Sequence, residues 1–389
     1  MRLLVVSNLY PPQELGGYGR SLADFAWGLQ RRGHELAVLC ADAPYLGPSD
    51  SGPNGEPAQR LLRLKGSFEG GVSLLDDAGA CTCIDQHNAS VVRQVLARGR
   101  YSGILLGNLD LLGAELLQPL LEPGIPLLHH VGFMTPPFEA RQWPKDGHYQ
   151  LVAASLAVRE ALAAAGLPVA ASAVVYPGAR MELFGRANQV LNGTSPLGTP
   201  ANPLKVCFAG LLMGSKGAHT LVEAAALLHQ NGVALQLNLA GAEFQAGYWQ
   251  QLNKLATQTG LADRLSWLGP LDRSKLARYL QLHHVGVFPS IYPEAFGIVG
   301  AEMLASGLAL VSSGVGGAAE LLEDGVSGLR FEPGNSADLA QQLLRLVEEP
   351  GLLERLQAAG QERVRKDFSV AQAAQQLEAL WGPTHSGIR

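Results

Sequence analysis

Charged residues are scarce in this chain of 389 residues: Lys, Arg, Asp and Glu together make up 16%, and the formal net charge is only −5. A protein that binds nucleic acid through its phosphates normally carries a basic face or a basic domain. The charge balance therefore predicts no nucleic-acid partner. A strongly basic amphipathic helix is also lacking, so the sequence leaves a peripheral membrane contact open without supporting one.

Cysteine and long apolar runs are rare as well. Of the four cysteines, Cys81 and Cys83 stand close together, but no second Cys/His pair follows at the spacing of a zinc site, so we expect reduced structural cysteines and no metal. No stretch reaches 18 uninterrupted apolar residues, which predicts no transmembrane helix. The opening apolar run, 3–6, is too short for a signal peptide; we expect it to be a first strand, in a cytoplasmic protein.

Apolar residues are plentiful, at 47%, and the chain is longer than a single hydrophobic core normally becomes. Apolar segments of strand length alternate with segments of helical period, which predicts α/β domains with parallel sheets and right-handed crossovers. In the first half, the expected strands are 3–8, 35–40, 103–107, 125–131, 151–155 and 171–178, with a helix near 18–32.

The pattern breaks over 186–203, which is rich in Asn, Gly, Ser, Thr and Pro and predicts an interdomain linker. We therefore expect an N-terminal domain over 1–185 and a C-terminal domain over 204–367. A closing helix at about 368–385 could pack back on the first domain. Residues 44–90 show weak periodicity and predict a long surface excursion or a mobile loop.

Residues 294–302 contain two carboxylates, Glu294 and Glu302, around a glycine-containing turn between two apolar runs. This order predicts a strand, a loop, a short helix, a turn and a second strand, with Glu294 in the loop and Glu302 in the helix. A helix N-terminus offers backbone N–H groups and a positive dipole end to an anion, while carboxylates accept hydrogen bonds from sugar hydroxyls. The combination suits a ligand that is part phosphate and part polyol.

Several segments together resemble the retaining glycosyltransferases of family four, whose GT-B fold has two Rossmann-like doubly wound domains with parallel sheets facing across a cleft. The resemblance covers most of the chain apart from 44–90 and the linker. It lies in a first strand followed by Pro-Pro and Gly16-Gly17, and in the segments VVYPGARMELF (174–184), FAGLLMGSKGAHTLVEA (208–224), PEAFGIVGAEMLASG (293–307) and GVGGAAELLEDGVSG (314–328).

The resemblance implies that the donor of the sugar, a nucleotide-diphosphate sugar, binds the C-terminal domain. Lys216 would neutralise the diphosphate leaving group, and Glu302 would accept the ribose hydroxyls. The remaining positions that it implies for this donor are the loop glycines Gly16 and Gly17, the first glutamate Glu294, and the backbone N–H groups of Phe296, Gly297 and Ile298.

Two further positions bear on how the donor would be bound. A histidine at a strand end contacts the donor sugar in many relatives; because side chains alternate along a strand, only one of His129 and His130 can point that way, and His130 is the favoured candidate. Family members commonly carry Gly-Arg where this chain has Gly210-Leu211, so a second cation for the diphosphate is missing. Arg180 and Arg273 are the candidate substitutes.

The implied function is metal-independent, retaining transfer of a sugar, most simply a hexose, to a hydroxyl of a sugar, polyol or lipid-linked acceptor. The nucleotide sugar is a co-substrate, and no cofactor is expected. Domain closure would expel water and align the acceptor. Alternatives on the same fold are a sugar phosphorylase, a nucleotide-sugar epimerase, and a non-catalytic partner that binds a nucleotide sugar. Only the missing arginine favours the last of these.

Overall fold

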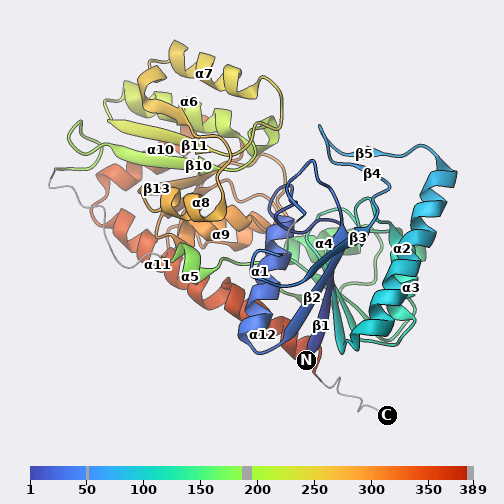
Figure 1. Ribbon diagram of the computed structural model, residues 1–389. Coiled ribbons are helices and arrows are strands. Elements are labelled where there is room, and N and C mark those ends of the chain that lie inside the picture. Colours follow the sequence, from blue (N-terminus) through green and yellow to red (C-terminus); the bar gives the residue numbers. More distant parts are fainter. Residues whose placement is uncertain (50–51, 186–194, 383–389) are drawn as a thin grey trace. The chain divides into compact units, whose positions relative to one another are not determined.

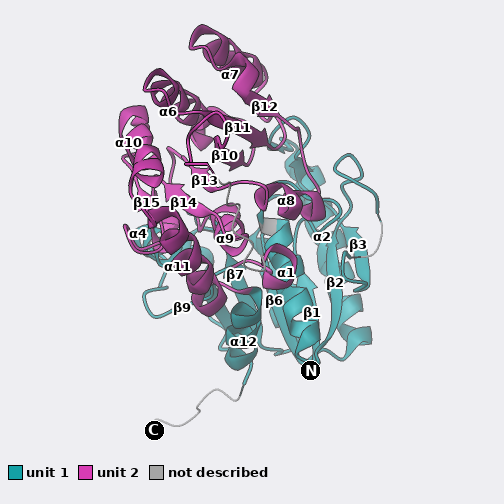
Figure 2. Ribbon diagram, turned by 90° about the vertical axis from the view of Figure 1, so that its left-hand side faces the viewer, with its two compact units in different colours: residues 1–177, 370–389 teal, residues 178–369 magenta. Residues whose placement is uncertain are grey.

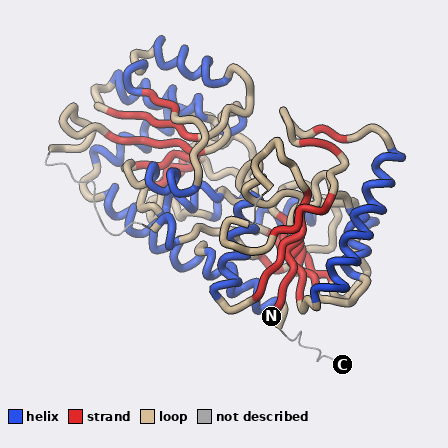
Figure 3. Tube along the Cα trace, in the orientation of Figure 1, coloured by secondary structure: helices blue, strands red, loops and turns tan. Residues whose placement is uncertain are grey.

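The computed structural model describes residues 1–49, 52–185 and 195–382. The chain divides into two compact units (Figure 2): unit 1 consists of residues 1–177 with the C-terminal segment from residue 370, and unit 2 of residues 178–369. In each unit, strands form the centre and helices the outside (Figure 3). No helix in the described ranges is both long and apolar enough to cross a membrane.

Unit 1 is built on a seven-stranded parallel sheet in the order β3-β2-β1-β6-β7-β8-β9. Its elements (Figure 1) are β1 (Arg2–Val6), α1 (Tyr18–Arg31), β2 (Glu35–Ala41), β3 (Ala58–Leu62), β4 (Gly66–Ser67), β5 (Ser73–Leu74), α2 (Ala78–Gly99), β6 (Gly103–Leu106), α3 (Leu117–Leu121), β7 (Leu127–Val131), β8 (Tyr149–Ala153), α4 (Leu156–Ala164), β9 (Ala173–Val174) and α12 (Val370–Leu380).

Unit 2 is built on a six-stranded parallel sheet in the order β12-β11-β10-β13-β14-β15. Its elements are α5 (Met181–Phe184), β10 (Leu204–Ala209), α6 (Ala218–Gln230), β11 (Leu235–Ala240), α7 (Tyr248–Gln258), β12 (Leu265–Trp267), α8 (Arg273–Leu280), β13 (Val285–Phe288), α9 (Ile298–Ala305), β14 (Ala309–Ser312), β15 (Leu329–Arg330), α10 (Ser336–Glu348) and α11 (Leu352–Asp367). Short 3-10 turns occur at η1 (Ala114–Leu116), η2 (Ala140–Gln142), η3 (Gly214–Lys216), η4 (Ala262–Arg264) and η5 (Gly317–Glu320).

Both sheets have the same winding. The chain starts at an inner strand, β1 or β10, moves outward through two strands to one edge, and then returns to continue on the other side of the starting strand. The direction reverses between β1 and β6 in unit 1, and between β10 and β13 in unit 2. In doubly wound sheets, ligands bind at the carboxyl ends of the strands beside this reversal. The topology therefore places one candidate site in each unit.

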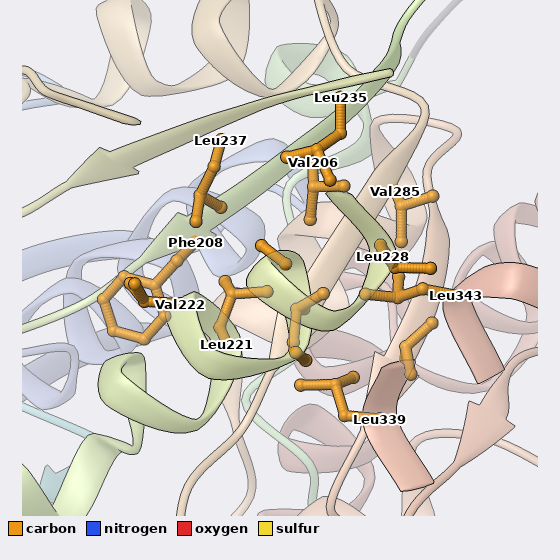
Figure 4. Packing of buried hydrophobic residues seen from close by; sticks show 14 of the residues in the cluster. Val206, Phe208, Leu221, Val222, Leu228, Leu235, Leu237, Val285, Leu339 and Leu343 are labelled. Carbon is orange, nitrogen blue, oxygen red and sulfur yellow. The ribbon is translucent and has the colours of Figure 1, made fainter. Parts of the chain in front are cut away.

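The core of unit 2 explains why its strands and helices form where the sequence predicts. Leu221 and Leu228 of α6 pack between the sheet and the α10 residues Leu339 and Leu343, all of them buried (Figure 4).

Side-chain caps stabilise the N-termini of several helices. At α8, for example, the Asp272 side chain accepts a hydrogen bond of 2.8 Å from the Lys275 N–H. Such a cap satisfies one of the N–H groups that a helix start leaves unpaired.

The segment between β2 and β6 differs from the expectation of an irregular excursion over 44–90. From Ala78 onward it is the long helix α2, and β3 joins the sheet beside β2. The side chain of Asp77 accepts hydrogen bonds from the N–H groups of Gly79 and Ala80 and caps this helix. Only five of its 22 residues are buried, Asn88, Val92, Val95, Leu96 and Gly99, which explains why its period is weak in the sequence.

The C-terminal helix α12 belongs to unit 1 and packs along α1. Gly28 lies at this interface: a Cβ built there would stand 2.8 Å from the Cβ of Ala374. Of the expected linker, 186–194 lies outside the described residues. Residues 195–203 join unit 2, where the Ala234 N–H donates to the Gly198 carbonyl at 2.7 Å.

Candidate functional site

Lys216 and Glu294 meet at the carboxyl edge of the unit 2 sheet. Lys216 ends η3, which follows β10, and Glu294 lies in the loop that follows β13. Their strands are neighbours at the reversal of the sheet, so Lys216 Nζ and Glu294 Oε1 lie 2.6 Å apart. The hydroxyl of Ser290 donates to the same carboxylate oxygen. Both side chains are only partly buried, so a ligand at this edge could reach them.

A glycine fixes the position of Lys216. Gly217 has φ +69°, and a Cβ built on it would stand 1.9 Å from the carbonyl oxygen of Pro289, a distance that no side chain tolerates. The Ile291 N–H also donates to the Ser215 carbonyl at 2.9 Å. The loop after β10 is therefore held directly against the loop after β13, and Lys216 is carried with it.

The loop after β14 completes this edge. The Gly317 N–H donates to the Glu294 carbonyl at 2.7 Å, and the Glu294 N–H donates to the carbonyl of Val315. Gly316 has φ +63°, and a Cβ on it would lie 2.5 Å from the Glu294 carbonyl oxygen. Loops that follow three strands thus converge on one acidic residue and one lysine.

Glu302 lies inside α9 and Glu294 in the preceding loop, as the sequence predicts. The Glu302 side chain is 1% exposed, which rules out a solvated surface charge. Arg273, the first residue of α8, faces it: Arg273 Nη2 lies 3.4 Å from Glu302 Oε1, and the guanidinium also stacks over the ring of Phe184, 5.5 Å from its centroid. Arg273 therefore pairs with the carboxylate that the family resemblance assigns to ribose.

The segment before α9 can serve a ligand only through its backbone. The Phe296 ring is buried and packs against Phe368, with 5.5 Å between ring centroids. Gly297 has φ +96°, and Ile298 is the first residue of the helix. The first N–H groups of any helix have no partner inside that helix and carry its positive dipole end. The predicted role of these three residues as backbone donors remains a prediction.

Gly16 and Gly17 begin the first helix of unit 1. Gly16 has φ +71°, and a Cβ built on it would have no atom within 4 Å, so open space borders this loop. Gly17 is the residue before α1 and has ordinary helical angles. Across the turn, Glu14 and Arg20 form an ion pair at 2.9 Å. The contact of Gly16 and Gly17 with a sugar donor stays a prediction.

His129 and His130 point to opposite faces of the unit 1 sheet, as alternation along β7 predicts. His130 lies edge-on against Phe25 of α1, and its Nε2–H donates to the Val175 carbonyl at 2.8 Å. On the other face, His129 Nδ1 is 2.8 Å from the Tyr149 hydroxyl. Both imidazoles are buried, so the choice between them as a residue near the sugar stays a prediction.

Burial keeps both imidazoles neutral. It lowers the pKa of His130 to about 4, and it lowers the pKa of His129 to about 3 with a further contribution from the neighbouring His130. A neutral imidazole can position a substrate by hydrogen bonding but cannot contribute a positive charge. The geometry therefore suits positioning.

A small cavity of about 10 Å³, enough for a single water molecule, lies at the carboxyl ends of β6 and β7. Its polar lining comes from Asn108, Asp110, Thr135 and the two histidines. Asn8, which follows β1 at the reversal of the sheet, braces this edge: its Nδ2 donates to the Asp110 carbonyl at 3.1 Å. Sequence patterns gave no signal for Asp110, because a lone Asp after a strand is common in surface loops.

Within the described ranges, no group of three or more His, Cys, Asp or Glu side chains gathers in a way that could hold a metal ion. Cys81 and Cys83 lie on α2 and are free thiols.

Comparison with known proteins gives matches in sequence and in structure. The family model of the glycosyl transferases group 1 matches residues 194–363. D-inositol 3-phosphate glycosyltransferases are similar in sequence: that of Streptomyces bingchenggensis is 31% identical over 223 residues, 56% of this chain and 49% of that protein. That of Thermomonospora curvata is 34% identical over 203 residues, 49% of this chain and 47% of that protein. The matched part thus spans about half the length of these relatives.

Solved structures match nearly the whole chain. Anabaena Alr3699/HepE in complex with UDP has a TM-score of 0.75 at 20% identity, covering 97% of this chain and 99% of that one. A glycosyltransferase from Rickettsia africae has a TM-score of 0.78 at 17% identity, covering 98% and 97%. At this identity the likeness concerns the fold, which is the GT-B type with two Rossmann-like domains, as the sequence predicts.

Proposed function

We propose that the protein transfers a sugar from a nucleotide-diphosphate sugar to an acceptor hydroxyl, because residues 194–363 match the family model of the glycosyl transferases group 1. The observation that carries the proposal is the meeting of Lys216 and Glu294 at the reversal of the unit 2 sheet. A cation and backbone N–H groups at this edge suit a diphosphate, and carboxylates suit the hydroxyls of a sugar.

In the proposed reaction, the acceptor oxygen forms a bond to the anomeric carbon as the bond from that carbon to the diphosphate oxygen breaks. The acceptor proton passes to an oxygen of the leaving diphosphate, and the anomeric configuration is retained. Lys216 stabilises the negative charge that develops on the leaving group. We propose that the reaction needs no metal ion, because Lys216 and the α9 N-terminus supply the positive field.

Glu302 is proposed to bind ribose. A buried carboxylate accepts hydrogen bonds from two neighbouring hydroxyls strongly, and here Arg273 already holds it in place. Uridine-diphosphate sugars are the first donors to test, because the solved neighbour Alr3699/HepE is described in complexes with UDP and with UDP-glucose. The name of the sequence relatives, D-inositol 3-phosphate glycosyltransferase, supports a polyhydroxylated acceptor.

The test is a thermal-shift and binding series with UDP-, GDP- and ADP-sugars. A ligand that binds only the folded protein raises the melting temperature, so one donor class should do so. Glu302→Ala should raise the Kd of that donor at least about tenfold, since hydrogen bonds to a charged group contribute roughly 1.5–3 kcal/mol each. Glu302→Gln, which preserves the shape beside Arg273, separates lost binding from lost folding.

Glu348→Ala is the matched control, because Glu348 is exposed at the end of α10. An unchanged donor Kd in both Glu302 variants would remove the ribose assignment. Leu211 is the feature that favours a non-catalytic nucleotide-sugar-binding protein. Turnover of any nucleotide sugar by the purified protein would exclude that alternative.

A further inference from the structure

Arg273 lies at the edge of the unit 2 sheet where the donor is proposed to bind. It is the first residue of α8, the helix that follows the carboxyl end of β12. The Asp272 side chain accepts a hydrogen bond from the Lys275 N–H and so fixes the start of this helix. The helix start therefore places Arg273 at the carboxyl edge of the sheet, where doubly wound sheets bind ligands.

An arginine is unfavourable at this position on local grounds. The N-terminus of a helix carries the positive end of its dipole, which favours acidic side chains in the first turn and disfavours basic ones. Within α8 itself the first turn contains no acidic residue. Where a residue breaks a local rule, a contact elsewhere in the fold normally compensates for it. For Arg273 that contact is with Glu302.

Glu302 supplies the negative charge that Arg273 faces. Every residue of α9 from Gly300 to Ala305 is buried, so the carboxylate is enclosed by apolar neighbours. A carboxylate is costly to bury without a cation beside it. Arg273 Nη2, which lies 3.4 Å from Glu302 Oε1, offsets that cost.

The contact is long for an arginine–carboxylate pair. In tight pairs the nitrogen and oxygen atoms are about 2.7–2.9 Å apart, whereas the distance between Arg273 Nη2 and Glu302 Oε1 is 3.4 Å. A hydroxyl that donates to Glu302 therefore does not have to break a tight ion pair first.

Phe184 binds the same guanidinium. Helix α5, which ends at Phe184, packs against both α8 and α9 (Figure 1). The Arg273 guanidinium lies over the buried ring of Phe184, 5.5 Å from its centroid, which is within the range of a cation–π contact. An aromatic ring and a carboxylate thus both act on Arg273 and fix its orientation.

We propose that Arg273 is a positioning residue of the donor site, which orients the Glu302 carboxylate toward the two neighbouring hydroxyls of the ribose and makes the site prefer a ribonucleotide to a 2′-deoxyribonucleotide. Arg273 acts through Glu302 and does not bind the diphosphate. The inference rests on the proposed function, in which Glu302 binds ribose, and adds the residue that sets the selectivity of this contact.

Titration calorimetry with UDP, 2′-deoxy-UDP and UMP tests the inference; if the thermal-shift series selects another base, the nucleotides of that base replace them. The unchanged protein should bind UDP about tenfold more tightly than 2′-deoxy-UDP, as expected for one hydrogen bond to a charged group. Arg273→Gln should raise the Kd of UDP about tenfold but that of 2′-deoxy-UDP only about threefold, because one of the two hydroxyls is already missing. The ratio of the Kd values of UDP and UMP should not change.

Two further variants separate positioning from a structural role. Arg273→Lys keeps a positive charge beside Glu302 and should restore part of the preference for UDP. Arg278→Gln is the matched control, because Arg278 is exposed near the end of the same helix.

Turnover gives an independent measurement. Arg273→Gln should raise the KM of the nucleotide sugar and leave kcat nearly unchanged, because the ribose contacts are the same before and during transfer. The two Kd values of each ratio come from one preparation, so a partly unfolded variant does not alter the ratio.

An equal loss of affinity for UDP and 2′-deoxy-UDP in Arg273→Gln would overturn the inference, because Arg273 would then support the fold or the diphosphate. So would loss of the preference for UDP in Glu302→Gln but not in Arg273→Gln. If the unchanged protein shows no preference for UDP and Glu302→Gln leaves every Kd unchanged, the ribose assignment of the proposed function fails instead. The two failures are therefore distinguishable.

Discussion

At the scale of residues, Glu294 and Glu302 carry the same group in different surroundings. Glu294 is partly exposed and shares its carboxylate with Lys216 and Ser290. Glu302 is buried and faces Arg273. A partly exposed carboxylate can exchange partners with a ligand at little cost, whereas a buried one must keep its hydrogen bonds satisfied. Glu294 therefore suits contacts that form and break beside the diphosphate during the reaction, and Glu302 suits recognition of a fixed pair of hydroxyls.

Leu211 gives a prediction at this scale. Arg273, one of the two arginines considered as a substitute for the missing cation, lies on Glu302. Leu211→Arg would place a bidentate guanidinium beside the loop of Lys216 and should lower the Kd of the nucleotide sugar about tenfold, which corresponds to one charged hydrogen-bonding contact. Titration calorimetry with the donor and with its nucleoside monophosphate checks this, because only the donor with a diphosphate should gain affinity.

The buried histidines predict how stability depends on pH. Both have a folded pKa well below the usual 6.5 of histidine, so between about pH 4 and 6.5 the unfolded chain binds protons that the folded chain does not. Stability is therefore complete above about pH 6.5 and falls as the pH is lowered. At pH 5 each histidine should cost about 2 kcal/mol relative to pH 7.

Urea unfolding of unit 1 at pH 7 and pH 5 measures this effect. His130→Gln should reduce the difference between the two pH values by the share of one histidine. His87→Gln, at a half-buried position on α2, is the control and should leave the difference unchanged. A pH difference that survives both His129→Gln and His130→Gln would contradict the assignment.

At the scale of elements, helix α12 completes the packing of unit 1. It packs on α1 at Gly28, and Glu378 of α12 binds both Arg32 and His34 at the start of β2, with the His34 contact at 3.0 Å. The pKa of the Glu378 carboxyl is lowered chiefly by its hydrogen bond from Arg32. The histidine in this turn therefore serves the packing of the C-terminal helix and not a ligand.

Gly28→Leu should push α12 away from α1. Because the built Cβ already lies 2.8 Å from Ala374, a larger side chain overpacks the interface and should destabilise unit 1 by about 1–3 kcal/mol. Chemical unfolding measures the loss, and proteolysis should release the C-terminal helix. Gly147→Leu is the control, since a Cβ there meets no atom within 4 Å. Equal stability of the two variants would argue against tight packing at Gly28.

At the scale of the whole molecule, the division into units crosses the order of the chain. Residues 370–380 close the core of unit 1 with Leu377, Ala373 and Ala374, although the preceding 192 residues, 178–369, belong to unit 2. Unit 1 is therefore incomplete until α12 has been made, whereas unit 2 is continuous.

Truncation after Ser369 should thus act on one unit only. Loss of α12 uncovers the apolar side chains of α1, so the melting transition of unit 1 should fall by 10 °C or more, by rough conversion of several kcal/mol of lost burial. Unit 2 should still bind the nucleotide sugar and be stabilised by it. Calorimetry with and without the donor resolves the two transitions; a fall of both together would show that the units unfold as one.

Sequence patterns sufficed for most of the fold for a physical reason. Apolar strands such as 204–210 alternate with helices of clear period such as 217–230, and the local pattern leaves only one arrangement, a doubly wound parallel sheet. The motif 293–307 likewise located Glu294 in a loop and Glu302 in a helix, since both depend on local order. The sequence pattern did not predict helix α2, because few of its positions are buried and its hydrophobic period is correspondingly weak.

What the tertiary structure alone decided depends on contacts between distant residues. Lys216 and Glu294 are 78 positions apart in the sequence and come into contact only because β10 and β13 are neighbours in the sheet. Likewise, Arg273 can pair with Glu302 only because the start of α8 lies close to α9. Burial of both histidines and the apolar cluster of Leu9, Phe68 and Leu111 also arise from the packing of separate segments. The sequence by itself determined the periodicity, the fold class and the pair of glutamates; which side chains meet, and with what charge around them, was decided by the folded chain.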